Sequence, residues 1–213
     1  MNTRTSFQVT GLLANRHIQS MLASSKLRRH LKSKDYTDLI ANEAEYILKA
    51  GTDIRLHCYY SKHTSTKSPQ NNNKLVILIH GWEGSAESTY LLSAASSLYN
   101  AGFSVLRLHL RDHGPSSYLN TELFHAARLE EVLKAMQDIQ SRFQYDENYL
   151  VGFSLGGNFA LRVRQEAKNY ALKLNHIVAI SPVFSPSETM AALETGTLIY
   201  RKYFIKKWKR ALR

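Results

Sequence analysis

Segments typical of strands and of helices alternate along the chain from Lys74 onward, and this order constrains the fold more than any other feature. The run from Lys74 to His80, KLVILIH, is apolar and rich in branched residues, as in a strand buried on both faces. Apolar periodicity predicts further strands and helices; the strands cover 103–110, 148–153 and 176–181, and the helices cover 86–99, 123–143 and 158–172. Such an order predicts an α/β fold, with a mostly parallel sheet and helices on both of its faces.

Two earlier segments extend this prediction toward the N-terminus. Residues 46–48 and 53–60 are typical of short strands, and Gly51 lies between them. We expect them to form an antiparallel hairpin at one edge of the sheet, with Gly51 in the turn.

The most informative stretch is YLVGFSLGGN, at 149–158, in which Gly152, Ser154 and Gly156 form the pattern G-x-S-x-G. Because it falls between a predicted strand and a predicted helix, the chain must turn sharply at the serine, and the glycines let strand and helix approach closely. The turn would raise Ser154 Oγ above the carboxyl ends of the strands, at a helix N-terminus that favours negative charge. We predict that Ser154 is a nucleophile; the plainer alternative is a glycine-rich turn with a capping serine.

An acyl-transfer enzyme also needs hydrogen-bond donors for the negative charge that develops on the attacked carbonyl oxygen. In a turn of this kind one donor is the N–H after the nucleophile, here Leu155, and the other comes from the loop after an earlier strand. The loop 80–84, HGWEG, follows such a strand, and we predict that the Trp82 N–H is the second donor. Gly81 would let the backbone come close, and His80 is expected to hold the loop rather than to act in catalysis.

With these residues in hand, the chain resembles the α/β-hydrolase superfamily and, more narrowly, its YheT-type branch of esterases, related to eukaryotic abhydrolase-domain lipases. The motifs that carry the resemblance are NRHIQS at 15–20, GTD at 51–53, HGWEG at 80–84, LRDHGPS at 110–116, GFSLGGN at 152–158, SPV at 181–183 and YRKYFIKKWK at 200–209. The last motif is similar to the family's lid, a basic and aromatic helix over the active site. The resemblance implies a small-molecule carboxylic ester, including a lipid ester, as substrate.

The chain departs from this pattern after the serine. In this fold the catalytic serine is followed by an acid and then a histidine. Only 59 residues follow Ser154, and their single histidine, His176, opens a predicted strand and so belongs at the opposite end of the sheet. Asp112 and His113 follow a strand and are expected to line the pocket or support it, but neighbours in sequence do not stack easily as an acid–base pair. The triad acid and histidine are therefore predicted to be absent.

This departure leads to three alternatives, which are a truncated or frameshifted gene, one piece of a split enzyme, and a non-catalytic remnant. The chain is expected to correspond to the front two-thirds of a hydrolase and to lack the last strands of the sheet. An apolar parallel edge would then be uncovered and open to association. Without a base, we expect negligible ester turnover from the chain alone.

Basic residues dominate the C-terminal segment. Seven of the last thirteen residues are Lys or Arg and none is acidic, within a formal net charge of +11. Phe204, Trp208 and Leu212 recur every four residues among them, as in an amphipathic helix. We prefer a lid helix whose apolar face covers the pocket; the alternative is a lipid-binding remnant in which 198–213 contacts an anionic membrane. No nucleic-acid partner is predicted, because the basic residues form no reading motif.

The remaining expectations concern cofactors, location and domains. Histidines and cysteine show no metal-ligand spacing and no phosphate loop is present, so neither metal nor cofactor is predicted. The single cysteine, Cys58, and the lack of a signal sequence or long apolar run predict a cytoplasmic protein, at most peripheral to a membrane. We divide the chain into an N-terminal arm with the first edge strand (1–50), an α/β core (51–186) and the beginning of a basic cap (187–213).

Overall fold

The structure is a computed structural model, and it describes residues 9–15, 18–19, 33–64, 71, 73–196 and 198–211. Parts of two sequence patterns fall elsewhere. Arg16, His17 and Ser20 of the N-terminal motif, and Leu212 of the C-terminal pattern, lie outside the described residues.

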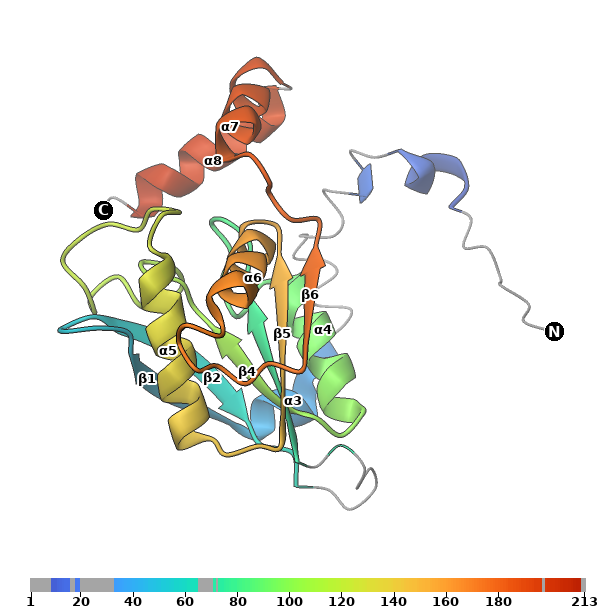
Figure 1. The fold of residues 1–213 in the computed structure, drawn as a ribbon. Helices are drawn as coiled ribbons and strands as arrows, with labels where there is room; N and C mark the ends of the chain where they lie inside the picture. The colour runs from blue at the N-terminus through green and yellow to red at the C-terminus, as the bar shows by residue number, and fades with distance from the viewer. Residues whose placement is uncertain are drawn as a thin grey trace.

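A six-stranded sheet forms the centre of the molecule, in the order β1-β2-β4-β3-β5-β6 (Figure 1). Its strands are β1 (Glu43–Lys49), β2 (Arg55–Ser61), β3 (Lys74–Ile79), β4 (Ser104–Leu108), β5 (Glu147–Phe153) and β6 (His176–Ile180). β1 and β2 form an antiparallel hairpin at one edge, β2 pairs antiparallel with β4, and β4, β3, β5 and β6 run parallel. The predicted parallel sheet with a hairpin at its edge is confirmed.

Helices cover both faces of this sheet (Figure 1). The helices of the described residues are the short 3₁₀ helices η1 (Gly11–Ala14) and η2 (Ser33–Tyr36), and α3 (Thr37–Ala41), α4 (Thr89–Asn100), α5 (Leu129–Arg142), α6 (Leu155–Glu166), α7 (Pro186–Thr195) and α8 (Leu198–Ala211), and only some of them cover the faces. α5 and α6 pack on one face of the sheet, and α4 packs with α3 on the other.

The central strand β3 shows why the sheet forms where it does. Leu75, Ile77 and Ile79 join the core beneath α5 and α6, whereas Val76 and Leu78 join the core beneath α4. All five side chains are at most 2% exposed. Each buried side chain of this kind contributes about 1.5–3 kcal/mol relative to an exposed one, so a continuously apolar strand is stable only between two layers of helices.

The bounds of α5 and α6 differ from the sequence-based expectation. α5 begins at Leu129 rather than at 123, because the preceding residues form a loop in which Asp112 Oδ2 accepts the Phe124 N–H at 2.7 Å. α6 begins at Leu155, directly after Ser154, and ends at Glu166 rather than at 172. The chain leaves it through a tight reversal in which Ala171 has a φ of 51° and the Leu172 N–H bonds to the Ala167 carbonyl.

The edge strand β6 keeps part of its apolar surface exposed. Within the described residues it pairs with β5 alone, and Val178 and Ile180 are 50% and 40% exposed. The expected apolar parallel edge is therefore present. Whether it promotes association stays a prediction.

β6 ends at the same edge of the sheet as β5, the edge formed by the carboxyl ends of the parallel strands. There α7 and α8 lie together above the sheet, apart from the layers of helices on its faces (Figure 1). In the part of the chain that the structure describes, no helix has the length and apolar character needed to span a bilayer.

Candidate active site

Ser154 sits at a strained turn between β5 and α6. Its φ of 52° and ψ of −115° are unusual for a residue with a side chain, and such a backbone costs about 1–3 kcal/mol. Hydrogen bonds on both sides hold it there: the Ser154 N–H donates to the Ile180 carbonyl at 2.9 Å, and its carbonyl accepts from the N–H groups of Asn158 and Val183. The predicted sharp turn therefore exists, and the neighbouring strand β6 stabilises it.

Gly152 and Gly156 are required by the closeness of the backbone around this turn. A Cβ on Gly152 would lie 2.1 Å from the Gly156 carbonyl oxygen. A Cβ on Gly156 would lie 2.4 Å from the His80 carbonyl oxygen and 2.5 Å from that of Ile79. The contact between Gly152 and Gly156 explains how α6 can start so near β5. The contact of Gly156 with Ile79 and His80 brings α6 against the end of β3.

The loop after β3 lies directly beside Ser154. A Cβ on Gly81 would be 3.2 Å from the Ser154 Cβ, so the two backbones are in close contact. The Gly81 N–H donates to Tyr90 Oη at 2.9 Å, and the Gly81 carbonyl accepts from the Gly84 N–H and from His80 Nδ1. The structure thus brings together the two segments that the sequence singled out.

Three histidine rings fix this loop by accepting backbone N–H groups at Nε2. The donors are Leu110 to His80, Glu83 to His113 and Ala86 to His109, at 3.2, 3.2 and 2.9 Å. His80 and His113 contact backbone carbonyls through Nδ1, so each ring fits the neutral form that carries its proton on Nδ1. The structural role expected for His80 agrees with these contacts.

The Ala86 peptide is held at both ends by buried side chains. His109 accepts its N–H, and Arg107 donates to its carbonyl at 2.8 Å. Behind them, His109 Nδ1 contacts His57 Nδ1 at 2.8 Å, and His57 Nε2 contacts the carboxylate of Glu45. Burial is the main cause that lowers the pKa of His109 to about 3, and the neighbouring Arg107 guanidinium acts in the same direction, so its acceptor nitrogen stays unprotonated.

A cavity of about 360 Å³ opens over Ser154. Its lining is mostly apolar and comes from the loop after β3, the loop before α5, the start of α6, the linker after β6, and α7 and α8, which form a cap. The lining residues are Trp82, Phe124, His125, Ala126, Ser154, Leu155, Val183, Pro186, Thr189, Met190, Leu193 and Phe204. Phe204 of α8 stacks on the Trp82 ring, with centroids 5.4 Å apart and planes at 20°. The cap therefore forms one wall of the cavity that contains the serine.

Asp112 and His113 do not line this cavity, contrary to one of the two roles expected for them. Asp112 holds the Phe124 N–H, and burial raises its pKa although that hydrogen bond opposes the change. His113 is buried, contacts the Phe124 ring edge-on and accepts the Glu83 N–H. Both support the walls of the pocket. His176, as expected, lies at the far end of the sheet, where it stacks on Tyr149.

The sequence prediction missed most of the cavity wall. Pro186, Thr189, Met190 and Leu193 of α7 follow the spacing i, i+3, i+4, i+7, which is the one signal that could have assigned them to a common face. His125 is the only ionisable side chain in the lining, and nothing in its sequence context marks it. It lies in the loop that we had predicted to be helical.

The cavity and its surroundings give no support for a metal site. Among the residues that the structure describes, no group of three or more His, Cys, Asp or Glu side chains could hold a metal ion. Nor does any described side chain hydrogen-bond to the Ser154 hydroxyl, which faces an apolar cavity.

Known proteins resemble this chain in part of its sequence and in its fold. The chain is 25% identical over 142 residues to a protein of Escherichia coli (strain K12) named "Putative esterase YheT", which covers 66% of this chain and 41% of that protein. The fold is similar to that of the Pyrococcus furiosus esterase Pf2001, with a TM-score of 0.61 and 19% identity over 77% of this chain and 59% of the other. Est1E from Butyrivibrio proteoclasticus gives a TM-score of 0.51 and 20% identity over 72% of this chain and 56% of the other.

The chain spans about 41% of the length of its curated relative, so these likenesses extend to part of that protein only. The family model of the alpha/beta hydrolase fold matches residues 74–206, which include β3, the turn at Ser154 and most of the cap. The chain therefore belongs to the α/β-hydrolase fold family.

Proposed function

We propose that this chain provides the nucleophile and the oxyanion-binding loop of a serine hydrolase that acts on carboxylic esters. The observation that carries the proposal is the strained turn at Ser154, which lies in a mostly apolar cavity and touches the loop after β3. In the reaction, Ser154 Oγ attacks the ester carbonyl, its proton passes to a base, and the alcohol leaves to give an acyl-serine.

Two backbone N–H groups are our candidates for stabilising the oxyanion. Leu155 is the first residue of α6, so its N–H has no acceptor within the helix. This N–H lies at the N-terminus of the helix, which is the positive end of the helix dipole. Trp82 follows Gly81, whose backbone touches Ser154, and its ring lines the same cavity. Loss of one such donor typically costs about 2.7–4 kcal/mol of barrier, so the fixed position of this loop matters for rate.

The walls of the cavity favour an apolar acyl group as the part of the substrate bound beside Ser154. Phe124, Met190 and Leu193 offer aliphatic and aromatic surface, and His125 is the one ionisable group among the lining residues. Lipid esters are included in the proposal for this reason. A single cysteine, Cys58, which is buried, is compatible with a reducing, cytoplasmic location, which we also include.

The base is the missing part of this proposal. His176 is the one histidine after Ser154, and it lies at the amino end of β6, one strand length away. His125 lines the cavity, but in the described part of the chain no carboxylate forms a hydrogen bond or ion pair with its ring, and Glu122 interacts with it only through its charge. We therefore propose that these 213 residues alone hydrolyse esters negligibly, with only the residual catalysis of oxyanion binding, about 10³–10⁴-fold over water.

A fluorophosphonate probe tests the nucleophile. We expect slow labelling of the wild type that disappears in Ser154→Ala and persists in Ser187→Ala, a matched control at an exposed serine of α7. Mass spectrometry of the labelled peptide should locate the adduct at Ser154. Labelling that survives in Ser154→Ala, or a wild type that is never labelled, would remove the nucleophile from the proposal while leaving the family assignment intact.

The same assay measures what His125 does. A general base usually contributes about 10²–10⁴-fold, whereas a wall residue contributes far less. Because no carboxylate of the described residues is hydrogen-bonded to its ring, we expect His125→Ala to slow labelling by less than about tenfold. A loss of about a hundredfold or more would instead identify His125 as the base and would contradict the expected inactivity of the chain.

A further inference from the structure

The two sides of α8 differ in chemistry. Phe204 faces the cavity, where it stacks on Trp82. Successive residues of a helix are rotated by about 100° around its axis. By this rotation a second set of residues shares one side of α8, an arc of about 140° that does not include Phe204. Every member of that set is exposed; they are Leu198, Arg201, Lys202, Ile205, Lys206 and Lys209, here called the outer face of α8. Phe204, the member of the apolar pattern whose side chain the structure describes, therefore lies off the outer face.

The outer face carries four positive charges and no negative one. Among the described residues none of its four cations forms an ion pair, in contrast to the buried Arg111 and the partly buried Arg128, which both pair with Glu131. Leu198, 64% exposed, and Ile205, 36% exposed, lie between these charges. A surface that is uniformly basic and also apolar fits a partner that is both anionic and able to bury aliphatic side chains.

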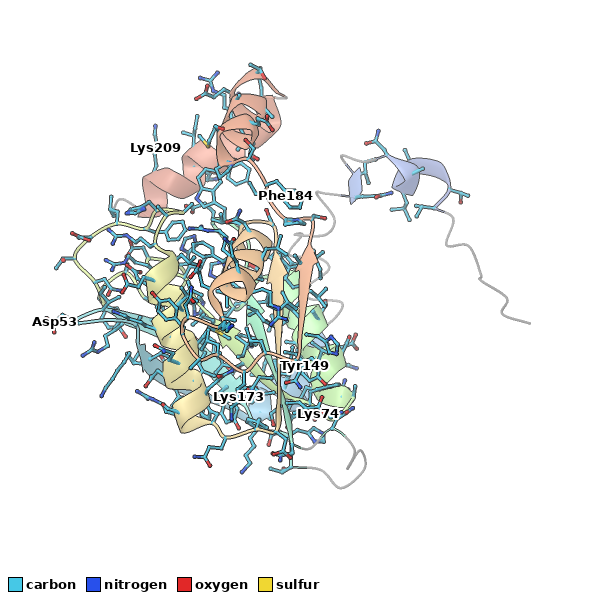
Figure 2. All side chains as sticks on the ribbon, viewed as in Figure 1. Asp53, Lys74, Tyr149, Lys173, Phe184 and Lys209 are labelled. Atoms are coloured by element: carbon cyan, nitrogen blue, oxygen red, sulfur yellow. The ribbon has the colours of Figure 1, made fainter. Side chains whose placement is uncertain are left out.

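The position of α8 adds a second constraint. The helix lies above the carboxyl ends of the strands, and Phe204 on its other side closes the cavity over Ser154. Figure 2 shows Lys209 at this end of the molecule and Lys173 at the opposite end. Whatever binds the outer face therefore lies next to the cap of the cavity and far from the amino end of the sheet.

We propose that the outer face of α8 docks on the surface of an anionic lipid bilayer. Leu198 and Ile205 would enter the boundary between headgroups and acyl chains, while the four cations lie among the phosphates. A nucleic acid would use the charges but would leave the exposed aliphatic side chains without a partner. The inference rests on the proposed function in one respect, because docking would bring the cavity close to ester lipids. The docking itself does not require a reaction at Ser154.

Vesicle flotation of the full chain tests the proposal. We compare vesicles of phosphatidylcholine alone with vesicles of equal parts phosphatidylcholine and phosphatidylserine, at low and at high salt. Each cation near an anionic surface changes partitioning about fivefold, so the double variant Lys202→Glu/Lys209→Glu should lower the partition coefficient by about 25-fold or more. The control Lys168→Glu/Lys173→Glu makes the same change of charge at exposed positions of the other end and should alter partitioning little.

Two further variants separate the contributions. Leu198→Ser should weaken binding at both salt concentrations, because it removes apolar contact rather than charge. Ser154→Ala should float like the wild type, so a failed fluorophosphonate experiment and a failed flotation experiment are distinguishable. Equal loss in the two charge-reversed variants, equal binding to neutral and anionic vesicles, or tighter binding to duplex DNA than to anionic vesicles at the same salt would each overturn the proposal.

Discussion

The loop between β3 and α4 and the cap formed by α7 and α8 meet at the same cavity but are held in opposite ways. The loop is fixed from beneath by buried histidine rings. His109 and His113 accept the Ala86 and Glu83 N–H groups of the loop, and His80 of the loop accepts the Leu110 N–H that follows β4. The cap has no buried residue in α7, and α8 reaches the loop through the stacked rings of Phe204 and Trp82. One wall of the cavity is thus part of the core, and the other rests on it.

This difference indicates that the two walls of the cavity have different roles. An oxyanion site acts through donors that need no reorganisation, so its backbone has to be rigid before the substrate arrives. A wall that admits an apolar substrate has to open, and elements with few buried contacts open at the lowest free energy. We infer that the loop sets the geometry of the reaction and that the cap controls access to it.

The largest expected effect comes from disturbing the rigid side. Gly156→Ala would push a methyl group into the carbonyl oxygens of Ile79 and His80, and backbone atoms cannot give way as a flexible side chain can. We expect a loss of more than about 3 kcal/mol in the free energy of unfolding, measured by urea denaturation.

Gly157→Ala is the matched control for that change. Its Cβ would lie 3.1 Å from the Gly152 carbonyl oxygen, so the neighbours need to shift by only a few tenths of an ångström, and the substitution favours the helix; the loss should be below about 1 kcal/mol. Similar losses in the two variants would show that the contact between α6 and the end of β3 is not the tight point of the fold.

An effect that is smaller per pH unit, but that accumulates as the pH falls, is expected from acid. The pKa of His109 is about 3 in the folded chain, below the ordinary value of 6.5, so the unfolded chain binds the proton more readily. The contribution of neutral His109 to the free energy of unfolding is fully present above pH 6.5. It decreases by about 1.4 kcal/mol per pH unit as the pH drops toward 3. Urea midpoints at several pH values should show this slope in the wild type and lose most of it in His109→Gln. An unchanged slope would contradict the clamp on the Ala86 peptide.

The smallest effect is expected on the cap side. Phe204→Ala removes a stacked pair, and such pairs contribute about 0.5–1.5 kcal/mol. We expect the free energy of global unfolding to change by less than about 1 kcal/mol, while amide hydrogen exchange speeds up in α7 and α8 alone. Faster exchange that also spread into 80–88 would mean that the cap holds the loop, and the comparison above would be reversed.

Local sequence patterns predicted the parts of this protein in which one segment determines its own structure. A continuously apolar β3 is stable only inside a sheet covered on both faces, and G-x-S-x-G between strand and helix permits a close turn at Ser154. The same patterns misplaced the start of α5, because the loop before it is held by Asp112, a residue from another part of the chain. Periodicity carries no information about such a distant contact.

What the sequence determined by itself is therefore the order of strands and helices and the position of the serine, since each depends on residues within a few turns of one another. Only the tertiary structure decided which groups surround that serine. The register of β2 against β4 sets His57 beside His109 across 52 residues of chain, and the packing of α8 on Trp82 selects Phe204 as a wall of the cavity. Contacts of this kind depend on how separate elements meet, which no single stretch of sequence specifies.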